Sequence, residues 1–332
     1  MTFRIPLLAA LVLASLSMPT LAQDEGILVY NAQHEALTQE WADAFTKETG
    51  ITVTIRQGSD LEVGNQILQE GANSPADVFL TENSPAMVLV DKAGLFEPLP
   101  ADILDQIPAE YRPANGHWTG IAARSTVFAY NINKLNADTL PKTMEELADP
   151  SWKLRWAASP SGADFQAIAG AYLALKGEDA TAQWLSAMRE NAVVVRGNRA
   201  AMAAANKGEV DGALIYHYYW FGDQAGTKEN SGNIALHYFK NEDPGAFVSI
   251  SGGGVLASSK HKEQALQFLK FVTGKGGQAV LRDGTSFEYA IGVGDAANPA
   301  LTPLADLQAP KIDPAQLDSA KVTQLMTAAG LL

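Results

Sequence analysis

The sequence predicts an α/β protein with two lobes, each a mostly parallel sheet flanked by helices, joined by two extended hinge strands. Strand and helix patterns alternate from residue 27 onward, as they do in parallel sheets. A second set of alternating patterns begins near residue 155. Long β-type runs at Ile121–Tyr130 and Phe247–Leu256 lie midway between these blocks, and we interpret them as the hinge strands.

The first block contains five elements in the order strand, helix, strand, helix, strand. Its first helix has apolar residues at Leu37, Trp41 and Phe45, which is helical spacing, and Gly50 provides the stop. This order within about 55 residues requires crossover connections and therefore predicts a parallel sheet. The predicted ranges are Ile27–Tyr30, Glu35–Thr49, Ile51–Ile55, Leu61–Gly71 and Ala76–Leu80.

The second block repeats this organisation. At roughly 150 residues per domain, the chain length suggests two domains. We place the first lobe at residues 23–125 plus about 249–299, and the second at residues 126–248 plus about 300–332. The predicted strands are Arg155–Ser159 and Gly212–Tyr216, and the predicted helices are Ala163–Leu175, Ala180–Asn191, Ala200–Lys207 and Lys262–Thr273.

Residues Met1–Ala22 have the pattern of a secretory signal. Arg4 supplies a positive charge, Pro6–Met18 is an unbroken run of apolar or small residues, and Thr20-Leu21-Ala22 is a small-residue cleavage site. No later stretch approaches the ~18 apolar residues that span a bilayer. We therefore expect an exported protein that is not membrane-embedded. A Gram-negative periplasm fits, because the chain has no Cys for a lipid anchor.

The composition excludes several classes of function. The absence of Cys excludes disulfides, thiolate metal sites and a Cys nucleophile. The formal net charge of −13 argues against nucleic acid, which binds to a basic face. It favours a cationic ligand only weakly, because net charge mainly governs solubility. Neither a Gly-x-Ser-x-Gly nor a His-Glu-x-x-His motif is present, so we do not expect an enzyme.

Polar residues gather just beyond the predicted strands, where open parallel sheets bind their ligands. His34 follows the first strand, Glu82 follows the third, and the pair Tyr218-Tyr219 follows Gly212–Tyr216. The loop Ser161-Gly162-Ala163 leads into a helix, whose first N–H groups suit an anion. These positions favour a common site at one rim.

Each group also has a plainer explanation. A lone His at a helix start is more often a surface residue, and Glu82 could cap the helix that follows it. A Tyr-Tyr-Trp run usually packs in a core, and a Ser-Gly-Ala loop is ordinarily a turn and cap. Only the shared position at strand ends favours binding over these alternatives.

Two phenols, one carboxylate and one imidazole form a hard, oxygen-rich donor set. Cu(I) prefers softer ligands, zinc more typically takes His and Cys, and calcium takes carboxylates and carbonyls. Ionising one Tyr at pH 7 costs roughly 4 kcal/mol, because the phenol pKa is about 10. Only a small, highly charged cation offsets that cost twice, and Fe(III) is the abundant candidate. Two phenolates and one carboxylate supply three negative charges, which match this ion.

The sequence resembles the periplasmic ferric-ion-binding proteins, the "bacterial transferrins" among the substrate-binding proteins of ABC transporters. The resemblance covers nearly the whole chain after the signal, and its most specific part is the Tyr-Tyr-Trp run together with the His and Glu blocks. The matching blocks are Tyr30-Asn31-Ala32-Gln33-His34, Ser74-Pro75-Ala76-Asp77-Val78-Phe79, Thr81-Glu82-Asn83-Ser84-Pro85-Ala86, Leu95-Phe96-Glu97-Pro98-Leu99, Ala123-Arg124-Ser125, Pro160-Ser161-Gly162-Ala163, Tyr218-Tyr219-Trp220 and Asp243-Pro244-Gly245-Ala246.

The resemblance implies a fold, a cargo and a set of ligands. The fold is that of a two-lobed periplasmic binding protein of the class II type. The cargo is Fe(III), bound with a synergistic carbonate or phosphate and delivered to an inner-membrane ABC permease by what we expect to be a monomer. The implied metal ligands are His34, Glu82, Tyr218 and Tyr219, and the implied anion-binding residues are Ser161, Gly162, Ala163, Asn198 and Arg124.

One departure from the family pattern lies beside the tyrosine pair. Family members often have two Asn before it, one of them an anion ligand, whereas this chain has Tyr216 and His217. These two residues are candidates for additional contacts at the site. We therefore expect looser discrimination among anions than a two-Asn site would give.

The main alternative is a related two-lobed binding protein for an organic ligand, such as a polyamine, thiamine or a phosphonate. Such a site would use aromatic walls and one or two acids, and Trp220 and Tyr216 could serve as walls. Against it, an organic cation does not need two adjacent phenols beside His and Glu. The colour of the purified protein separates the two hypotheses.

Overall fold

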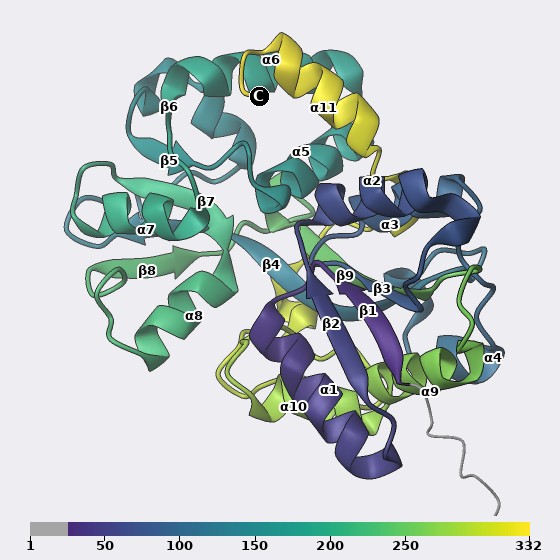
Figure 1. Cartoon of the computed structure of the whole chain (residues 1–332). Coiled ribbons are helices and arrows are strands. Elements are labelled where there is room, and N and C mark those ends of the chain that lie inside the picture. Colours follow the sequence, from purple (N-terminus) through teal and green to yellow (C-terminus); the bar gives the residue numbers. More distant parts are fainter. Residues whose placement is uncertain (1–25) are drawn as a thin grey trace, which may run out of the picture.

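The computed structural model describes residues 26–332, and the predicted signal Met1–Ala22 lies outside the described residues. Its strands are connected in the order β2-β1-β3-β9-β4-β7-β5-β6, with β8 paired to β4. Figure 1 shows two groups of helices and strands on either side of β4 and β9, so the sheet runs through both lobes. Within residues 26–332, no helix combines the length and the apolar character needed to cross a membrane.

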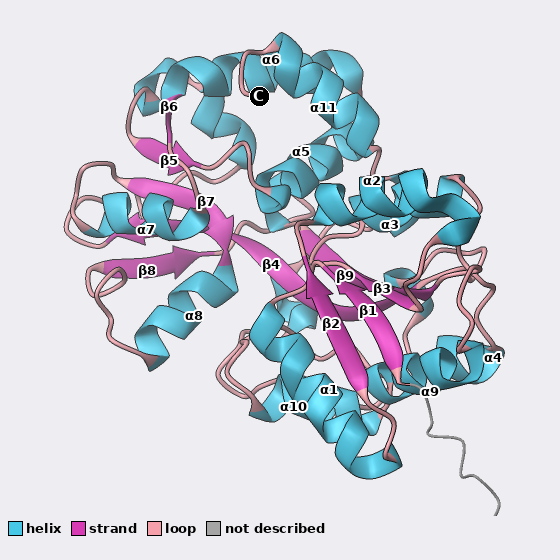
Figure 2. Ribbon diagram, viewed as in Figure 1, coloured by secondary structure: helices cyan, strands magenta, loops and turns pink. Residues whose placement is uncertain are grey.

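The first lobe is built on three parallel strands. β1 pairs in parallel with β2 and β3, and β3 pairs antiparallel with β9. Helices cover both sides of this part of the sheet (Figure 2). The strands are β1 (Ile27–Asn31), β2 (Val53–Gln57), β3 (Val78–Leu80) and β9 (Val248–Val255), and the helices are α1 (Glu35–Thr49), α2 (Asp60–Glu70), α3 (Pro85–Lys92), α4 (Ala101–Leu104), α9 (Lys262–Thr273) and α10 (Lys275–Asp283).

The second lobe has its own parallel strands. β5 pairs in parallel with β6 and β7, and the C-terminal helix α11 packs on α5 and α6. The strands are β5 (Trp156–Ala158), β6 (Ala192–Val194), β7 (Gly212–Tyr216) and β8 (Ile234–His237), and the helices are α5 (Ala163–Lys176), α6 (Glu178–Asn191), α7 (Asn198–Asn206), α8 (His217–Ala225) and α11 (Ser319–Ala328).

Strand β4 (Thr119–Asn131) joins the lobes. Residues 119–125 pair with β9, and residues 126–130 pair with β7. β4 and β9 are the two extended strands predicted at Ile121–Tyr130 and Phe247–Leu256. The predicted two-lobed α/β class is therefore confirmed, whereas the predicted domain boundaries stay predictions.

The second strand differs from its predicted range, since it begins at Val53 rather than Ile51. Thr49 Oγ1 accepts a hydrogen bond from the Ile51 N–H, and Thr46 Oγ1 donates to the Ile51 carbonyl. These two threonines at the end of α1 satisfy the backbone of Ile51, which is therefore held in the loop after Gly50. Gly50 has φ +80°, the left-handed conformation that ends a helix.

Large aromatic side chains fill the core of each lobe. Trp41, Phe45 and Phe268 pack together in the first lobe, and the Phe45 and Phe268 rings meet edge to face at 5.2 Å. Trp156 and Trp184 are buried in the second lobe. Each lobe therefore has its own aromatic core.

Replacing Gly212 by Ala is expected to destabilise the second lobe. A Cβ at this position would lie 2.3 Å from Cζ of Phe128 on β4, so the ring or the strand must shift. We expect a loss of about 1–3 kcal/mol in the free energy of unfolding. As a control, Gly222→Ala lies at an exposed position of α8 with nothing within 4 Å of the new Cβ, and should be neutral or slightly stabilising. Equal stability of both variants in urea unfolding would contradict the expectation.

Candidate functional site

The four predicted metal ligands lie at the carboxyl ends of strands from both lobes. His34 immediately precedes α1, after β1, and Glu82 follows β3. Tyr218 and Tyr219 lie in the first turn of α8, directly after β7. The parallel strands of each lobe thus direct these side chains toward the space between the lobes.

The structure brings these side chains into contact across that space. His34 Nε2 lies 3.2 Å from Glu82 Oε1, and the Tyr218 hydroxyl donates a 2.7 Å hydrogen bond to the same oxygen. The Tyr218 ring lies edge-on to the His34 imidazole, with 4.9 Å between the ring centroids. The centroids of the Tyr218 and Tyr219 rings are 4.3 Å apart. The His34 side chain is 34% exposed and Glu82 is 19% exposed, so a small ion can reach the site from solvent.

Asp164, which the sequence analysis missed, lies at the centre of the second-lobe side. Its Oδ2 accepts hydrogen bonds from the hydroxyls of Tyr218 (3.3 Å) and Tyr219 (3.2 Å) and from Nδ2 of Asn198 (2.7 Å). Asp164 is 4% exposed. A signal was available, because Asp164 directly follows the predicted anion-binding loop Ser161-Gly162-Ala163.

A buried cluster supports His34 from the far side of its ring. Glu288 Oε1 lies 2.9 Å from His34 Nδ1, and Glu288 Oε2 accepts a hydrogen bond from Nη2 of Arg124. The side-chain oxygen Oε1 of Gln33 accepts from Arg124 at 3.3 Å and from the His34 backbone N–H at 2.7 Å. A carboxylate on the second nitrogen of a metal-binding imidazole fixes its orientation and raises its basicity. Glu288 was also missed, since no local pattern marks it.

The predicted anion-binding residues divide into two groups. Asn198 lies beside the phenols, but its amide nitrogen already donates hydrogen bonds to Asp164 at 2.7 Å and to the Tyr219 hydroxyl at 3.3 Å. Arg124 is fully buried, and its guanidinium carbon lies over the Tyr218 ring, 5.8 Å from the ring centroid. Ser161 is exposed, and Gly162 precedes α5 without a side-chain cap. The carboxylate of Asp164 thus takes the donor that was predicted for a free anion.

Tyr216 and His217 are buried, and their side-chain hydrogen bonds go to residues other than the four predicted ligands. The Tyr216 hydroxyl donates to Asn83 Oδ1 at 3.2 Å. His217 Nδ1 accepts from the backbone N–H of Ser125 at 3.2 Å, and its ring stacks on Tyr289 at 4.8 Å. Burial lowers the pKa of His217 to about 4, so this imidazole is neutral.

Burial and neighbouring charges shift the pKa values of the groups at the site. Burial raises the pKa of both phenols above the usual value, with nearby Asp164 and Glu82 adding to the shift. Burial, and then the charge of Glu82, raise the pKa of Asp164 to about 7. Against its own burial, Glu82 has its pKa lowered to about 2 by His34 and Arg124. Burial alone would lower the pKa of His34, but hydrogen bonds to Glu288 and Glu82 raise it to about 10.

The cation that fits is one that accepts phenolates. Within residues 26–332, no three or more His, Cys, Asp or Glu side chains are placed to hold a metal ion by themselves. A metal site here therefore depends on Tyr218 and Tyr219. Such a donor set selects a hard, highly charged ion over zinc or copper.

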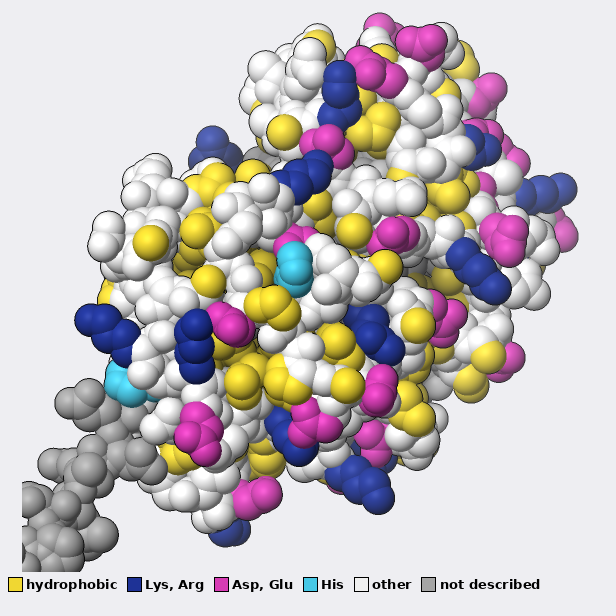
Figure 3. Space-filling view, turned by 90° about the vertical axis from the view of Figure 1, so that its right-hand side faces the viewer, with side chains coloured by type: hydrophobic (Ala, Val, Ile, Leu, Met, Phe, Trp, Pro, Cys, Tyr) yellow, Lys and Arg dark blue, Asp and Glu magenta, His cyan; other side chains and the backbone are white. Residues whose placement is uncertain are grey.

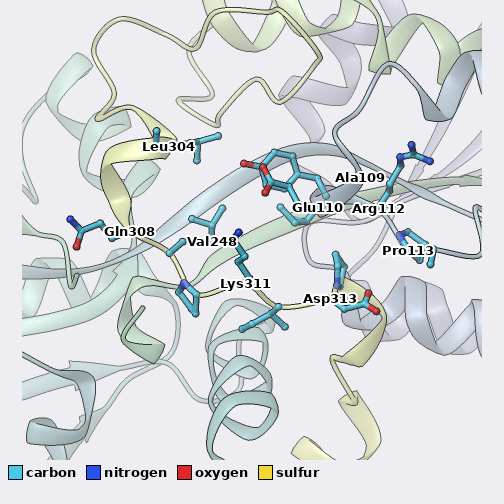
Figure 4. Close-up of a pocket in the computed structure, with 17 residues that line it drawn as sticks. Ala109, Glu110, Arg112, Pro113, Val248, Leu304, Gln308, Lys311 and Asp313 are labelled. Carbon is cyan, nitrogen blue, oxygen red and sulfur yellow. The ribbon is translucent and has the colours of Figure 1, made fainter. Parts of the chain in front are cut away.

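A cavity of about 920 Å³ lies elsewhere, behind the hinge strand β9 (Figure 4). Its walls are residues 109–114, 304–305 and 308–314 together with Val248 and Ile250. None of the four predicted ligands lines it. A bound ion needs converging donors rather than volume, so the interlobe cluster is the better candidate.

The chain is similar to known binding proteins over most of its length. The family model described as "Bacterial extracellular solute-binding protein" matches residues 73–315. The chain is 61% identical over 328 residues to the "Fe(3+)-binding periplasmic protein" of Serratia marcescens, covering 99% of this chain and 97% of that one. It is 35% identical over 333 residues to the "Major ferric iron-binding protein" of Neisseria meningitidis serogroup B, covering 99% of each chain.

Solved structures show the same relationship. The crystal structure of iron-bound HitA from Pseudomonas aeruginosa superposes with a TM-score of 0.86 at 40% identity, covering 92% of this chain and all of that one. A Trichodesmium protein solved with iron and citrate ligands gives a TM-score of 0.78 at 25% identity, over 92% of this chain and all of that one. The chain therefore belongs to the bacterial extracellular solute-binding proteins and, among them, to the periplasmic ferric-ion-binding proteins.

Proposed function

We propose that this protein captures Fe(III) between its lobes through His34, Glu82, Tyr218 and Tyr219. The observation that carries the proposal is the convergence of these four side chains from two lobes, at 2.7 Å between Tyr218 and Glu82 and 3.2 Å between Glu82 and His34. The ion would replace the protons that hold these contacts in the metal-free form. Its relatives in Serratia and Neisseria carry ferric iron in their names, which supports the same cargo here.

The geometry adds Asp164 as a fifth ligand. Its Oδ2 already contacts both phenolic oxygens, where a bound ion would lie. For an octahedral ion, five protein ligands leave one position, and the predicted carbonate or phosphate competes for it with water. The citrate in the Trichodesmium structure supports an open position of this kind in the family.

Replacing Asp164 by Asn tests which group completes the coordination. We expect the ferric affinity of wild-type protein to change less than about threefold on adding phosphate or carbonate. Asp164→Asn removes a direct ligand, so it should lose more than about 100-fold in affinity and recover part of it when either anion is added. Asp211→Asn is the control, because Asp211 pairs with Arg155 away from the site. The opposite result would be a wild-type ferric affinity that depends strongly on the anion and an Asp164→Asn variant with unchanged affinity. It would mean that the anion, and not Asp164, occupies the fifth coordination position.

We propose the periplasm as the site of action and an inner-membrane ABC permease as the recipient of the ion. The predicted signal and the periplasmic relatives support this location. The protein would act as a monomeric carrier rather than an enzyme. On the face shown in Figure 3, Lys and Arg side chains alternate with Asp and Glu, so that face presents no extended basic surface for nucleic acid.

Ferric loading followed by native mass spectrometry tests the cargo directly. The expected result is one iron ion per chain and a coloured protein. An unchanged mass and a colourless solution would overturn the proposal and favour the organic-ligand alternative, whose candidates are a polyamine, thiamine or a phosphonate.

A further inference from the structure

The side chain of Asn83, next to the proposed ligand Glu82, has every hydrogen-bonding position occupied. It is 1% exposed. Its Oδ1 accepts from the hydroxyls of Ser249 at 2.7 Å and Tyr216 at 3.2 Å. Its Nδ2 donates to Asp164 Oδ1 at 3.1 Å and to Asp60 Oδ2 at 3.4 Å. A primary amide has two donor hydrogens and two acceptor sites, so this one is saturated.

The partners of Asn83 come from both lobes and from the hinge. Asp60 begins α2 in the first lobe, and it also accepts the backbone N–H groups of Glu82 (2.9 Å) and Asn83 (3.0 Å). Asp164 and Tyr216 belong to α5 and to the end of β7 in the second lobe. The remaining partner is on the hinge strand β9. One first-lobe amide therefore holds two second-lobe side chains.

The contact with Asp164 bears directly on the site. Oδ1 of Asp164 faces Asn83, and Oδ2 faces Tyr218 and Tyr219. Asn83 thus fixes which edge of the carboxylate is turned toward the phenols. The Asp60 carboxylate, which accepts the backbone N–H groups of Glu82 and Asn83, fixes the backbone of Glu82 itself.

Tyr216 supplies the second-lobe donor for the hydrogen bond to Asn83. Its hydroxyl donates to Asn83 Oδ1 and to the Asp164 carbonyl at 3.4 Å, and its ring is fully buried. A shorter Asn at position 216 could not present a hydroxyl to Asn83 in this way. The tyrosine at this position therefore makes a hydrogen bond between the lobes.

We propose that Asn83 and Tyr216 form an interlobe latch, which positions Asp164 and Glu82 and slows release of the bound ion. Neither side chain is a metal ligand. The latch rests on the proposed function for its effect on iron, but its effect on lobe closure does not. Opening the lobes breaks the Asn83 contacts with Tyr216 and Asp164, while those with Asp60 and Ser249 can persist.

Lobe closure can be measured without metal, because the chain has no Cys and accepts two new labelling sites. Lys47→Cys on α1 and Lys207→Cys after α7 are both exposed and carry a donor and an acceptor dye. Tyr216→Phe and Asn83→Ala should each lengthen the mean distance between the dyes in the metal-free protein. Tyr172→Phe is the control, because its hydroxyl bonds to Glu145 at 3.2 Å within the second lobe. An unchanged distance in both latch variants would overturn the proposal.

The second measurement is the rate at which iron passes to an excess of chelator. We expect release to be about tenfold faster from Tyr216→Phe. This variant keeps the ring and removes the hydrogen bond to Asn83 between the lobes, together with the 3.4 Å bond to the Asp164 carbonyl within the second lobe. The double variant Asn83→Ala/Tyr216→Phe should release iron no faster than Asn83→Ala alone, because each single change already breaks the hydrogen bond between Tyr216 and Asn83. Strictly additive effects of the two changes would contradict a shared latch. If wild-type protein binds no iron, the proposed function fails, and the dye distances still decide on the latch.

Discussion

Replacing Tyr219 by Phe is expected to remove most of the ferric affinity and the visible colour of iron-loaded protein. A phenolate bound to Fe(III) gives a charge-transfer band, so the band depends on Tyr218 and Tyr219. Losing a direct ligand should exceed the 10- to 100-fold loss typical of groups that only support one, and we expect more than about 100-fold. Tyr218→Phe should be at least as severe, since it also leaves Glu82 without its 2.7 Å partner.

The measurement is a ferric titration followed by absorbance in the visible. Tyr172→Phe removes a buried phenol that bonds to Glu145 outside the site, and it should keep both band and affinity. The double variant Tyr218→Phe/Tyr219→Phe should be colourless at any iron concentration. A band of normal intensity in that double variant would mean that the phenols do not bind the metal.

Much of the fold was predictable because its elements are locally encoded. The helix Glu35–Thr49, the strand Gly212–Tyr216 and the helix Lys262–Thr273 match their predicted bounds. The two helices have apolar residues at helical spacing, the first with a stop at Gly50, and the strand is a short continuous apolar run. The start of β2 was misplaced because side-chain bonds from Thr46 and Thr49 decide the conformation of Ile51, and hydrophobic alternation does not report such bonds.

The candidate site was predictable only where it follows a strand end. His34, Glu82 and the tyrosine pair were found by this rule, and the structure places them together. Glu288 could not be found in this way. It reaches His34 from 254 positions along the chain, and the isolated bridge between Ala123 and Tyr289 brings it there. The role of Tyr216 could not be predicted without knowing that Asn83 lies next to it. A phenol at a strand end can equally bind a metal or donate a hydrogen bond to Asn83.

Iron binding is expected to release about three protons per ion near neutral pH. In the metal-free form the His34 pKa is about 10, so the imidazole carries a proton on the nitrogen that must bind the ion. Burial, with Asp164 and Glu82, holds the phenol pKa values of Tyr218 and Tyr219 above the usual range, so both hydroxyls are also protonated. All three protons must leave before these atoms can coordinate iron.

The sign of the pH dependence follows from this count. Below pH 10 the free protein holds these protons and the iron-bound protein does not, so protons compete with iron and affinity falls as pH drops. Three protons correspond to about a thousandfold loss of affinity per pH unit. Asp164, with a pKa of about 7, should add to this slope on the acid side of neutrality. Glu82 contributes little until the pH approaches its pKa of about 2.

A pH-stat measures the released protons directly while a ferric chelate is added to metal-free protein. The same addition to Tyr218→Phe/Tyr219→Phe protein gives the blank for the chelate itself. Tyr219→Phe should release one proton fewer per ion bound than wild-type protein, since only one phenol then ionises. Burial makes the phenols costly to ionise, and the same cost makes acid an effective signal for releasing the ion. Binding without proton release, at an affinity independent of pH, would mean that neutral phenols and a free imidazole hold the ion, which contradicts the ligand set proposed for this site.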